Sequence, residues 1–294
     1  MWDSISKRLR RVAYWQWAML GCLPVLFAWV LWIGWRGDES EAAANLESQG
    51  VDLSVVELIP TAILHRLPPW IRSRWAWYRV VHIRLVHSQS SDPDILRELH
   101  RLPALKTLHV YGSGTNSQTP SRQFSETPEP LLETLANLTQ LQNLGIMNCD
   151  IPRDGMRRLS KLTHLRVLLL SGASVNDSDL ETMNSHKSLR ILDLEGTNVC
   201  GSGLRYLGEL QDLERLDLSR SPFADEFVPL LLNLRKLRKL GLENTKITDA
   251  SVPDLSQLQS IRQLRVSGLS EYAISQLRLA LPNCEVYQAP LRDD

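Results

Sequence analysis

Residues able to do chemistry are scattered through this sequence without the spacing that a catalytic site requires. No HExxH, GxSxG, GxxxxGK[ST] or GxGxxG segment occurs, so the signatures of metalloproteases, serine hydrolases and nucleotide-binding proteins are absent. Residues 111–114 (YGSG) and 200–203 (CGSG) resemble turns that carry nucleophiles. We interpret them as structural turns, because glycine is the usual turn former. The sequence therefore predicts a protein that is not an enzyme.

Metal and cofactor sites are not indicated either. The histidines are dispersed, and His82 and His109, expected on successive strands, are interpreted as a surface pair. The four cysteines lack CxxC or Cys/His spacing, so neither a zinc site nor a dense disulfide framework is expected. A single Cys200–Cys284 bridge stays open as an alternative. We predict no cofactor and no small-molecule substrate. The cysteines are Cys22, Cys149, Cys200 and Cys284.

The charge distribution argues against a nucleic-acid partner. Lys plus Arg and Asp plus Glu number 33 each. Residues 1–36 contain five basic residues and one acidic residue, a net charge of +4, so the other 258 residues sum to −4. A basic binding face is therefore not expected beyond the N-terminal segment.

A repeated pattern dominates the second half of the chain. Segments of the form LxxLxL start 24 residues apart, at Leu141, Leu165, Leu189, Leu213 and Leu237; the first ends in Ile146 instead of leucine. In a strand, the two residues of LxL point to one face and the residue between them points to the other. Apolar residues three apart after the turn predict a helical return segment that faces the same core. This is the pattern of leucine-rich repeats, whose period is about 20–29 residues.

One unit cannot bury enough apolar surface alone, so stacked units form the stable object. The predicted fold is an α/β solenoid, a leucine-rich repeat horseshoe of about eight repeats over 80–282, with a parallel sheet on its concave face. The excess residues of one long unit, about 111–130, are rich in Gly, Ser, Thr and Pro and predict an inserted surface loop. Residues 283–294 are expected to cap the array, with a short strand in 281–287.

An uncharged run at 12–35 predicts one transmembrane helix. Its 24 residues would extend about 36 Å, enough to cross a hydrocarbon core of about 30 Å. The run is too long for the apolar part of a cleaved signal peptide, which is the alternative. Four basic residues precede it, so the positive-inside rule leaves the tail 1–11 in the cytoplasm and the repeats outside it, at the cell membrane.

Residues 36–79 form a juxtamembrane and capping region of different composition. The stretch DESEAAANLESQG predicts a short helix that ends at Gly50, and VDLSVVEL predicts a strand. Trp70, Trp75 and Trp77 precede the first repeat. We interpret them as an aromatic cap over the first unit rather than a ligand site, because large aromatic side chains mainly supply buried area.

The order of these parts resembles a group of bacterial membrane-anchored leucine-rich repeat proteins. The resemblance rests on RLRR, the run 12–35, ANLESQG, PPWI and YRVVHIRL, and it covers nearly the whole chain. It implies the fold and a single-pass topology but supplies no catalytic residues. The group often has Ile/Val-Thr-Asp after the turn, and here only ITDASV at 247–252 retains that motif.

Residues between the strand leucines should form the concave face, where strands lie about 4.8 Å apart. Apolar residues there predict a patch in mid-array, and such patches often mark binding sites. Cover by the inserted loop, or a flat and weakly polar inner surface, is an equal alternative. Four carboxylates lie beside the patch, partly offset by Arg215 and Lys239. We interpret them as a solvated face, since Ca²⁺ needs about six or more oxygens. The apolar set is Tyr111, Met147, Val167, Leu169 and Ile191; the carboxylates are Asp193, Glu195, Asp217 and Glu243.

The sequence therefore predicts a membrane-anchored protein that recognises another protein or peptide through the concave face of an extracytoplasmic solenoid. In that reading Tyr111, Met147, Leu169 and Ile191 are apolar anchors. The carboxylates of Asp193, Glu195 and Asp217 would favour a basic rim on the partner. The alternative is a structural, self-associating protein of the cell envelope.

Overall fold

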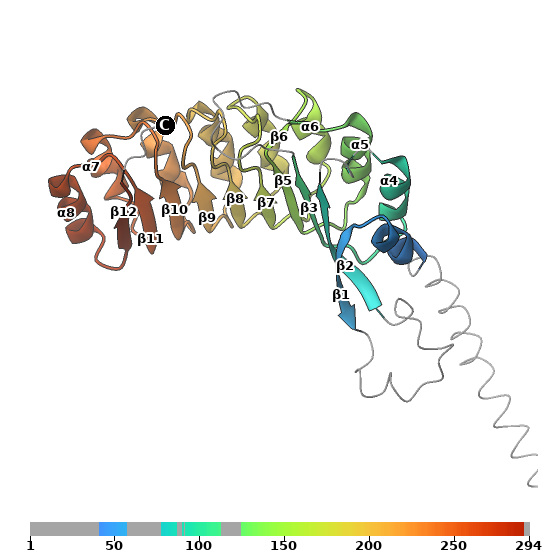
Figure 1. Cartoon of the computed structure of the whole chain (residues 1–294). Coiled ribbons are helices and arrows are strands. Elements are labelled where there is room, and N and C mark those ends of the chain that lie inside the picture. Colours follow the sequence, from blue (N-terminus) through green and yellow to red (C-terminus); the bar gives the residue numbers. More distant parts are fainter. Residues whose placement is uncertain (1–40, 58–77, 87–89, 91, 113–124, 291–294) are drawn as a thin grey trace, which may run out of the picture.

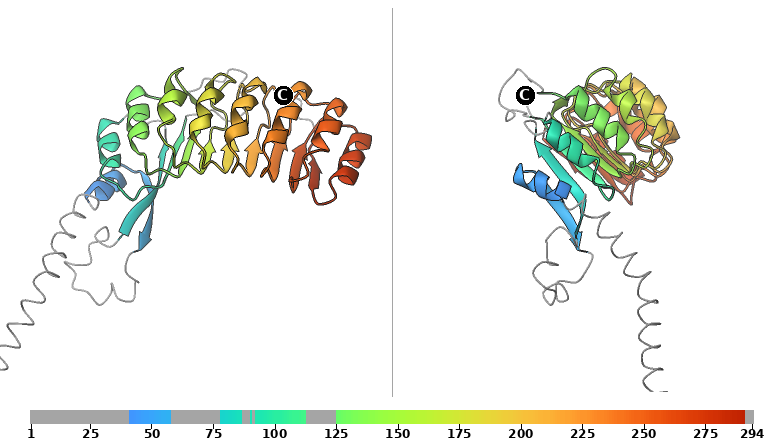
Figure 2. Two further views of the ribbon diagram at one scale, coloured as in Figure 1. Left: turned by 180° about the vertical axis from the view of Figure 1, so that it is seen from behind. Right: turned by 90° about the vertical axis from the view of Figure 1, so that its right-hand side faces the viewer.

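The computed structural model describes residues 41–57, 78–86, 90, 92–112 and 125–290. They form a solenoid in which one sheet lines one face and helices line the other (Figures 1 and 2). The sheet order is β1-β2-β3-β5-β7-β8-β9-β10-β11-β12, with β1–β2 antiparallel and the later pairs parallel. The strands are β1 Asp52–Glu57, β2 Tyr78–Val86, β3 Thr107–Tyr111, β5 Asn143–Met147, β7 Val167–Leu169, β8 Ile191–Asp193, β9 Arg215–Asp217, β10 Lys239–Leu242, β11 Gln263–Val266 and β12 Glu285–Gln288.

The return segments mix α-helices with 3-10 helices. A 3-10 helix has about three residues per turn, so apolar residues three apart share one face. Leu204, Leu207 and Leu210 follow this spacing and are buried. The sequence predicted helical returns, and several of them are of this tighter kind. The α-helices are α4 Pro93–Leu99, α5 Glu129–Asn137, α6 Gly155–Leu159, α7 Val252–Leu255 and α8 Glu271–Ala280; the 3-10 helices are η2 Asp179–Ser185, η3 Ser202–Glu209, η4 Asp225–Asn233 and η5 Asp249–Ser251.

The repeated leucines form the core, as predicted. The first leucine of each LxL pair is at most 1% exposed, whereas the residue after it faces the other side of the sheet. Strand register keeps equivalent residues side by side: Leu144 pairs with Leu168, and Leu192 pairs with Leu216. The prediction of inward-facing strand leucines is therefore confirmed. These leucines are Leu144, Leu168, Leu192, Leu216 and Leu240.

Aspartates connect successive units at the turn that leads into the return segments. The Asp177 carboxylate accepts hydrogen bonds from the backbone N–H groups of Cys200, Gly201 and Gly203 at 2.7–3.0 Å. Asp249 accepts from the backbone N–H and the hydroxyl of Ser270 at 2.8 and 2.6 Å. Each carboxylate thus satisfies backbone donors of the next unit, which fixes the stacking of the two units.

The inserted segment is shorter than predicted. Strand β4, Ser125–Glu126, pairs in parallel with β6, Cys149–Asp150, and α5 begins at Glu129. The last residues of the expected loop 111–130 therefore belong to strand β4 and to the start of helix α5. Residues 113–124 lie outside the described part of the chain.

The ends of the array agree with the sequence where they are described. Residues 41–48 are helical, and Gly50 follows with a φ of 76°, a left-handed conformation that glycine adopts without strain. The predicted strands correspond to β1 and β12. Among the described residues, no helix has the length and hydropathy needed to cross a membrane. The predicted span 12–35 and the aromatic cap of Trp70, Trp75 and Trp77 lie outside those residues.

Candidate functional site

The solvent side of the parallel sheet, which the sequence predicts to be concave, is called the sheet face below. At its N-terminal end a cluster of rings covers β2 and β3. The rings of His82 and His109 are in edge contact, with centroids 4.9 Å apart, and Arg84 stacks over Tyr111 at 4.4 Å. Burial, together with the charges of His82 and Arg84, lowers the pKa of His109. The two histidines are neighbours, as the sequence predicted.

Half-buried apolar side chains follow on β5, β7 and β8. Met147, Val167, Leu169 and Ile191 are neither fully exposed nor in the core. In the register, Val167 pairs with Ile191, so the two side chains are adjacent. Gly145 lies below this group, and a Cβ there would come within 2.9 Å of Met147 and His109. The glycine therefore allows those two side chains to fold across the sheet.

The first two carboxylates of the predicted acidic group are partly engaged within the chain. Asp193 Oδ1 accepts a hydrogen bond from the backbone N–H of Glu195 at 3.0 Å. Burial raises the pKa of Glu195, and the nearby carboxylates of Asp217 and Asp193 raise it further. Arg220 lies 3.9 Å from the Glu195 carboxylate. The Glu195 carboxyl is thus a weaker acid than an ordinary glutamate.

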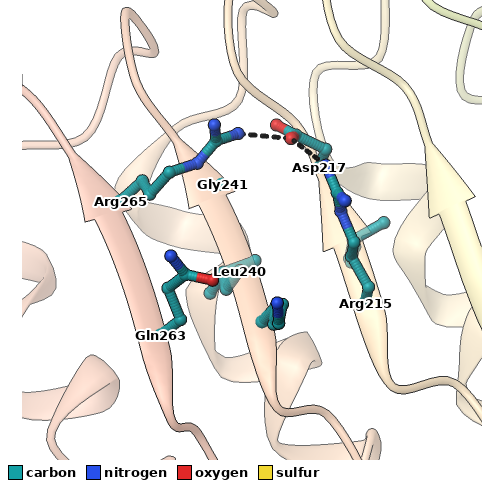
Figure 3. A pocket seen from close by; sticks show the side chains of 8 residues that line it. Arg215, Asp217, Leu240, Gly241, Gln263 and Arg265 are labelled. Atoms are coloured by element: carbon teal, nitrogen blue, oxygen red, sulfur yellow. Dashed lines mark hydrogen bonds and ion pairs between the residues drawn. The ribbon is translucent and has the colours of Figure 1, made fainter. Parts of the chain in front are cut away.

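Asp217 differs most from the sequence prediction. It is 2% exposed, and Arg265 Nη2 donates to its Oδ2 at 2.5 Å across the intervening strand β10 (Figure 3). The strand between them presents Gly241, where any Cβ would collide with both partners. The backbone N–H of Ser219 also donates to Asp217 Oδ1, at 3.2 Å. Asp217 therefore serves as an internal anchor for Arg265 and does not offer a free negative charge.

A hollow of about 210 Å³ lies beside this ion pair on β9–β11 (Figure 3). Arg215 Nη2 is 3.7 Å from Asp217 Oδ2, and Arg265 Nη1 is 3.7 Å from Glu243 Oε2. The polar lining is mainly cationic, in contrast to the acidic group that the sequence predicted at this end. The lining residues are Arg215, Leu216, Asp217, Lys239, Leu240, Gly241, Gln263 and Arg265.

The cysteines of the described residues are free thiols: Cys200 is exposed, Cys149 is buried, and Cys284 is intermediate. Burial raises the pKa of Cys149 to about 11, so its thiol stays protonated at neutral pH. The alternative of a Cys200–Cys284 bridge is wrong for this structure. Within the described part of the chain, no group of three His, Cys, Asp or Glu side chains is arranged to hold a metal ion.

Sequence reasoning missed residues whose role depends on neighbours across the sheet. Arg265 pairs with Asp217 on β9, and Arg220 lies 3.9 Å from Glu195 of the preceding unit; no local motif indicates either contact. His186 occupies the position that is leucine in adjacent units, as in Leu162 and Leu210. Aligning the units at their 24-residue period is enough to identify this histidine as an exception. It lies in the core, away from the sheet face.

Comparison with known proteins supports the fold. No family model and no curated protein matches the chain. A leucine-rich repeat protein of Leptospira interrogans is similar with a TM-score of 0.50 and 18% identity, over 76% of this chain and 51% of that one. An internalin of Listeria monocytogenes (TM-score 0.43, 15% identity, 65% and 56% covered) and a TDR receptor (0.45, 16%, 79% and 36%) are also similar. The chain thus spans about half or less of those structures. Its fold is a leucine-rich-repeat-like solenoid with a parallel sheet.

Proposed function

We propose that this chain is a membrane-anchored recognition protein that binds a protein or peptide on its sheet face. The supporting observation is the group of half-buried apolar side chains on strand positions that face solvent. Such positions are normally polar, and contiguous apolar surface often marks an interaction site. The proposed anchors are Tyr111, Met147, Val167, Leu169 and Ile191, flanked by the carboxylates of Asp193 and Glu195.

The geometry suits apolar anchors better than charged ones. The anchors lie on β3, β5, β7 and β8, which are neighbours in the sheet and about 4.8 Å apart. We call these five residues the apolar strip. Beside them, the Glu195 carboxylate lies 3.9 Å from Arg220, and Asp217 is buried and paired with Arg265. The affinity should therefore come mainly from apolar burial, as it does at the centre of many interfaces.

Capture from membranes tests this proposal. The full-length chain, in wild-type form and as Leu169→Arg, is crosslinked in membranes and recovered with its partners. Leu279→Arg is the matched control, because Leu279 on α8 is 76% exposed and lies outside the strip. We expect Leu169→Arg to lose a protein that wild type and Leu279→Arg both retain. Equal recovery of every protein by all three chains would refute the proposal.

The anchor and the topology are part of the proposal and rest on the sequence. Residues 12–35 would span the membrane, with 1–11 in the cytoplasm and the repeats outside. Cys200 is exposed, so a membrane-impermeant maleimide added to intact cells should label it. Cys200→Ser is the control that removes this label. Labelling of Cys200 only after the membrane is opened would reverse the proposed orientation.

A second candidate function, self-association in the cell envelope, is favoured by one observation. Three large apolar side chains are exposed at the C-terminal end: Tyr272 (73%), Leu279 (76%) and Tyr287 (48%). If this end joins two copies, the purified chain will assemble with increasing concentration, and Leu279→Arg will prevent assembly. The two substitutions at positions 169 and 279 therefore separate the candidates.

A further inference from the structure

The hollow on β9–β11 has an excess of positive charge that the chain leaves uncompensated. Arg265 is held by the buried Asp217 and by Glu243, so its charge is balanced within the protein. Arg215 lies only at the margin of that pair, 3.7 Å from Asp217, with 44% of its side chain exposed. Lys239 is exposed and has no ion-pair partner in the part of the chain that the structure describes.

The positive surface continues over the adjoining edge of the sheet. A second hollow, of about 240 Å³, is lined by the residues that precede Arg215 and Lys239 in the chain and by their neighbours. Lys236 pairs with Asp212 at 2.6 Å, and Glu214 is 3.8 Å from Arg190. Arginines without a carboxylate partner among the described residues remain around it. The lining of this second hollow is Glu214, Arg235, Lys236, Arg238, Ser260 and Arg262.

We propose that the hollow at Gly241 binds a carboxylate side chain of an acidic peptide segment, with Arg215 and Lys239 as its direct partners. Arg215 and Lys239 are register partners on neighbouring strands, which lie about 4.8 Å apart, and Lys239 in turn pairs with Gln263. Arginine and lysine donors form charge-assisted hydrogen bonds to a carboxylate. The Gln263 amide offers a further donor beside them.

The chemistry of the lining favours a carboxylate over a nucleic acid. No aromatic side chain from the described part of the chain lines either hollow, whereas single-stranded nucleic acid is usually held by base stacking on aromatic rings. The carboxylate of Glu214 also lies within the lining of the second hollow and would repel a dense row of phosphates. A segment with spaced single charges fits such a surface better.

This inference rests on the proposed function and specifies the partner. The hollow lies on β9–β11, beyond the apolar strip, which ends on β8 at Ile191. A partner that crosses the sheet face would therefore place an acidic segment on one side of its apolar contact. The sequence suggested a basic rim on the partner. We propose an acidic segment instead, because the Asp217 carboxylate is already paired with Arg265.

Fluorescence anisotropy tests the site directly. The probe is a labelled octapeptide of alternating Glu and Gly, compared with its Gln and Gly counterpart, on the full-length chain in uncharged detergent. The test variant is Arg215→Gln with Lys239→Gln. The control is Arg153→Gln with Arg157→Gln, which removes the same charge from exposed residues at α6. Circular dichroism verifies that each variant is folded.

Wild type should bind the Glu peptide at least about tenfold more tightly than the Gln peptide, since each charged hydrogen bond contributes about that factor. The test variant should lose that preference, and the control should keep it. Equal binding of both peptides by wild type, or equal binding by test and control variants, would overturn the assignment. So would tighter binding of an eight-nucleotide thymidine strand, which would indicate a phosphate polymer.

The outcome is distinguishable from a failure of the proposed function. Leu169→Arg should leave binding of the Glu peptide unchanged, because Leu169 does not line the hollow. If the Glu peptide binds as expected but Leu169→Arg still captures every membrane protein, the apolar strip is wrong and the carboxylate site stands. If capture depends on Leu169 but the Glu peptide does not bind, the carboxylate site is wrong and the apolar strip stands.

Discussion

Substitution His186→Leu should stabilise the protein, and more strongly in acid. His186 is completely buried, and its Nδ1 lies 3.1 Å from the carbonyl of Leu162. Its Nε2 has no hydrogen-bond partner among the described residues. The equivalent positions in adjacent units, such as Leu162 and Leu210, carry leucine. The fold therefore accommodates leucine at this place in the repeat.

The magnitude at pH 7.5 comes from three contributions. Removing an unsatisfied buried nitrogen gains about 1–3 kcal/mol, and losing the hydrogen bond to Leu162 costs about 0.5–1.5 kcal/mol. The Leu162 carbonyl still accepts a hydrogen bond from the backbone N–H of Leu165 at 3.2 Å, so the substitution does not leave this carbonyl unsatisfied. The greater hydrophobicity of leucine adds to the gain. We expect a net stabilisation of about 1 kcal/mol or more.

The pH dependence adds a second contribution. Burial lowers the pKa of His186 in the folded state, although the carbonyl of Leu162 opposes this. Below about pH 6.5 the unfolded chain binds a proton that the folded chain does not, so wild-type stability falls as the pH falls. If the folded ring stays neutral, the loss between pH 7.5 and 5.5 reaches a maximum of about 1.4 kcal/mol. His186→Leu removes this loss.

Urea denaturation at pH 5.5, 6.5 and 7.5, followed by circular dichroism, measures both effects. His186→Gln serves as a polar variant that cannot titrate, and His164→Leu as a substitution at an exposed histidine. We expect the stability gap between His186→Leu and wild type to widen toward pH 5.5. A gap that is constant with pH, or a less stable His186→Leu at pH 7.5, would refute the reasoning about the buried ring.

Two further predictions concern the aspartates that join units. Asp177→Ala removes the acceptor for three backbone N–H groups and should lower the free energy of unfolding by about 1–3 kcal/mol; an unchanged urea midpoint would contradict this role. The hydroxyl and N–H of Ser270 lower the pKa of Asp249, so this carboxylate stabilises the fold above its unfolded pKa and loses that effect as the pH falls through its folded pKa. Asp249→Asn should therefore flatten the decline of stability in acid, below about pH 4, and a variant with the wild-type acid profile would rule out the contribution.

The positions of the strand leucines were predictable because their spacing in the sequence follows directly from the geometry of a strand and of the repeat. A residue spacing of two separates the faces of a strand, and the 24-residue period places Leu168 beside Leu192 without knowledge of the rest of the fold. The rows of the sheet face followed from the same register. Thus, the sequence was sufficient to place Leu169 next to Asp193.

The chemistry of the sheet face was less predictable, since it depends on side-chain reach. Asp217 was expected at the surface, but Arg265 crosses the glycine strand between them and covers it. In the sequence, Gly241 is only one of the outward-facing strand positions. Its lack of a Cβ matters once β9, β10 and β11 lie side by side, because it leaves room for Arg265 to reach Asp217. The predicted boundaries of the inserted loop were too wide for a similar reason. The pairing of β4 with β6 joins residues 24 apart in the sequence, and no local pattern indicates it.

Site-specific photocrosslinking tests the central claim most directly. A photoreactive residue is introduced at position 169 on the sheet face or at position 157 on α6, in the full-length chain within its native membrane. We predict a crosslinked foreign protein from position 169 that is absent from position 157. Crosslinks to the same proteins from both positions, or from position 157 alone, would contradict the assignment of the sheet face as the binding surface.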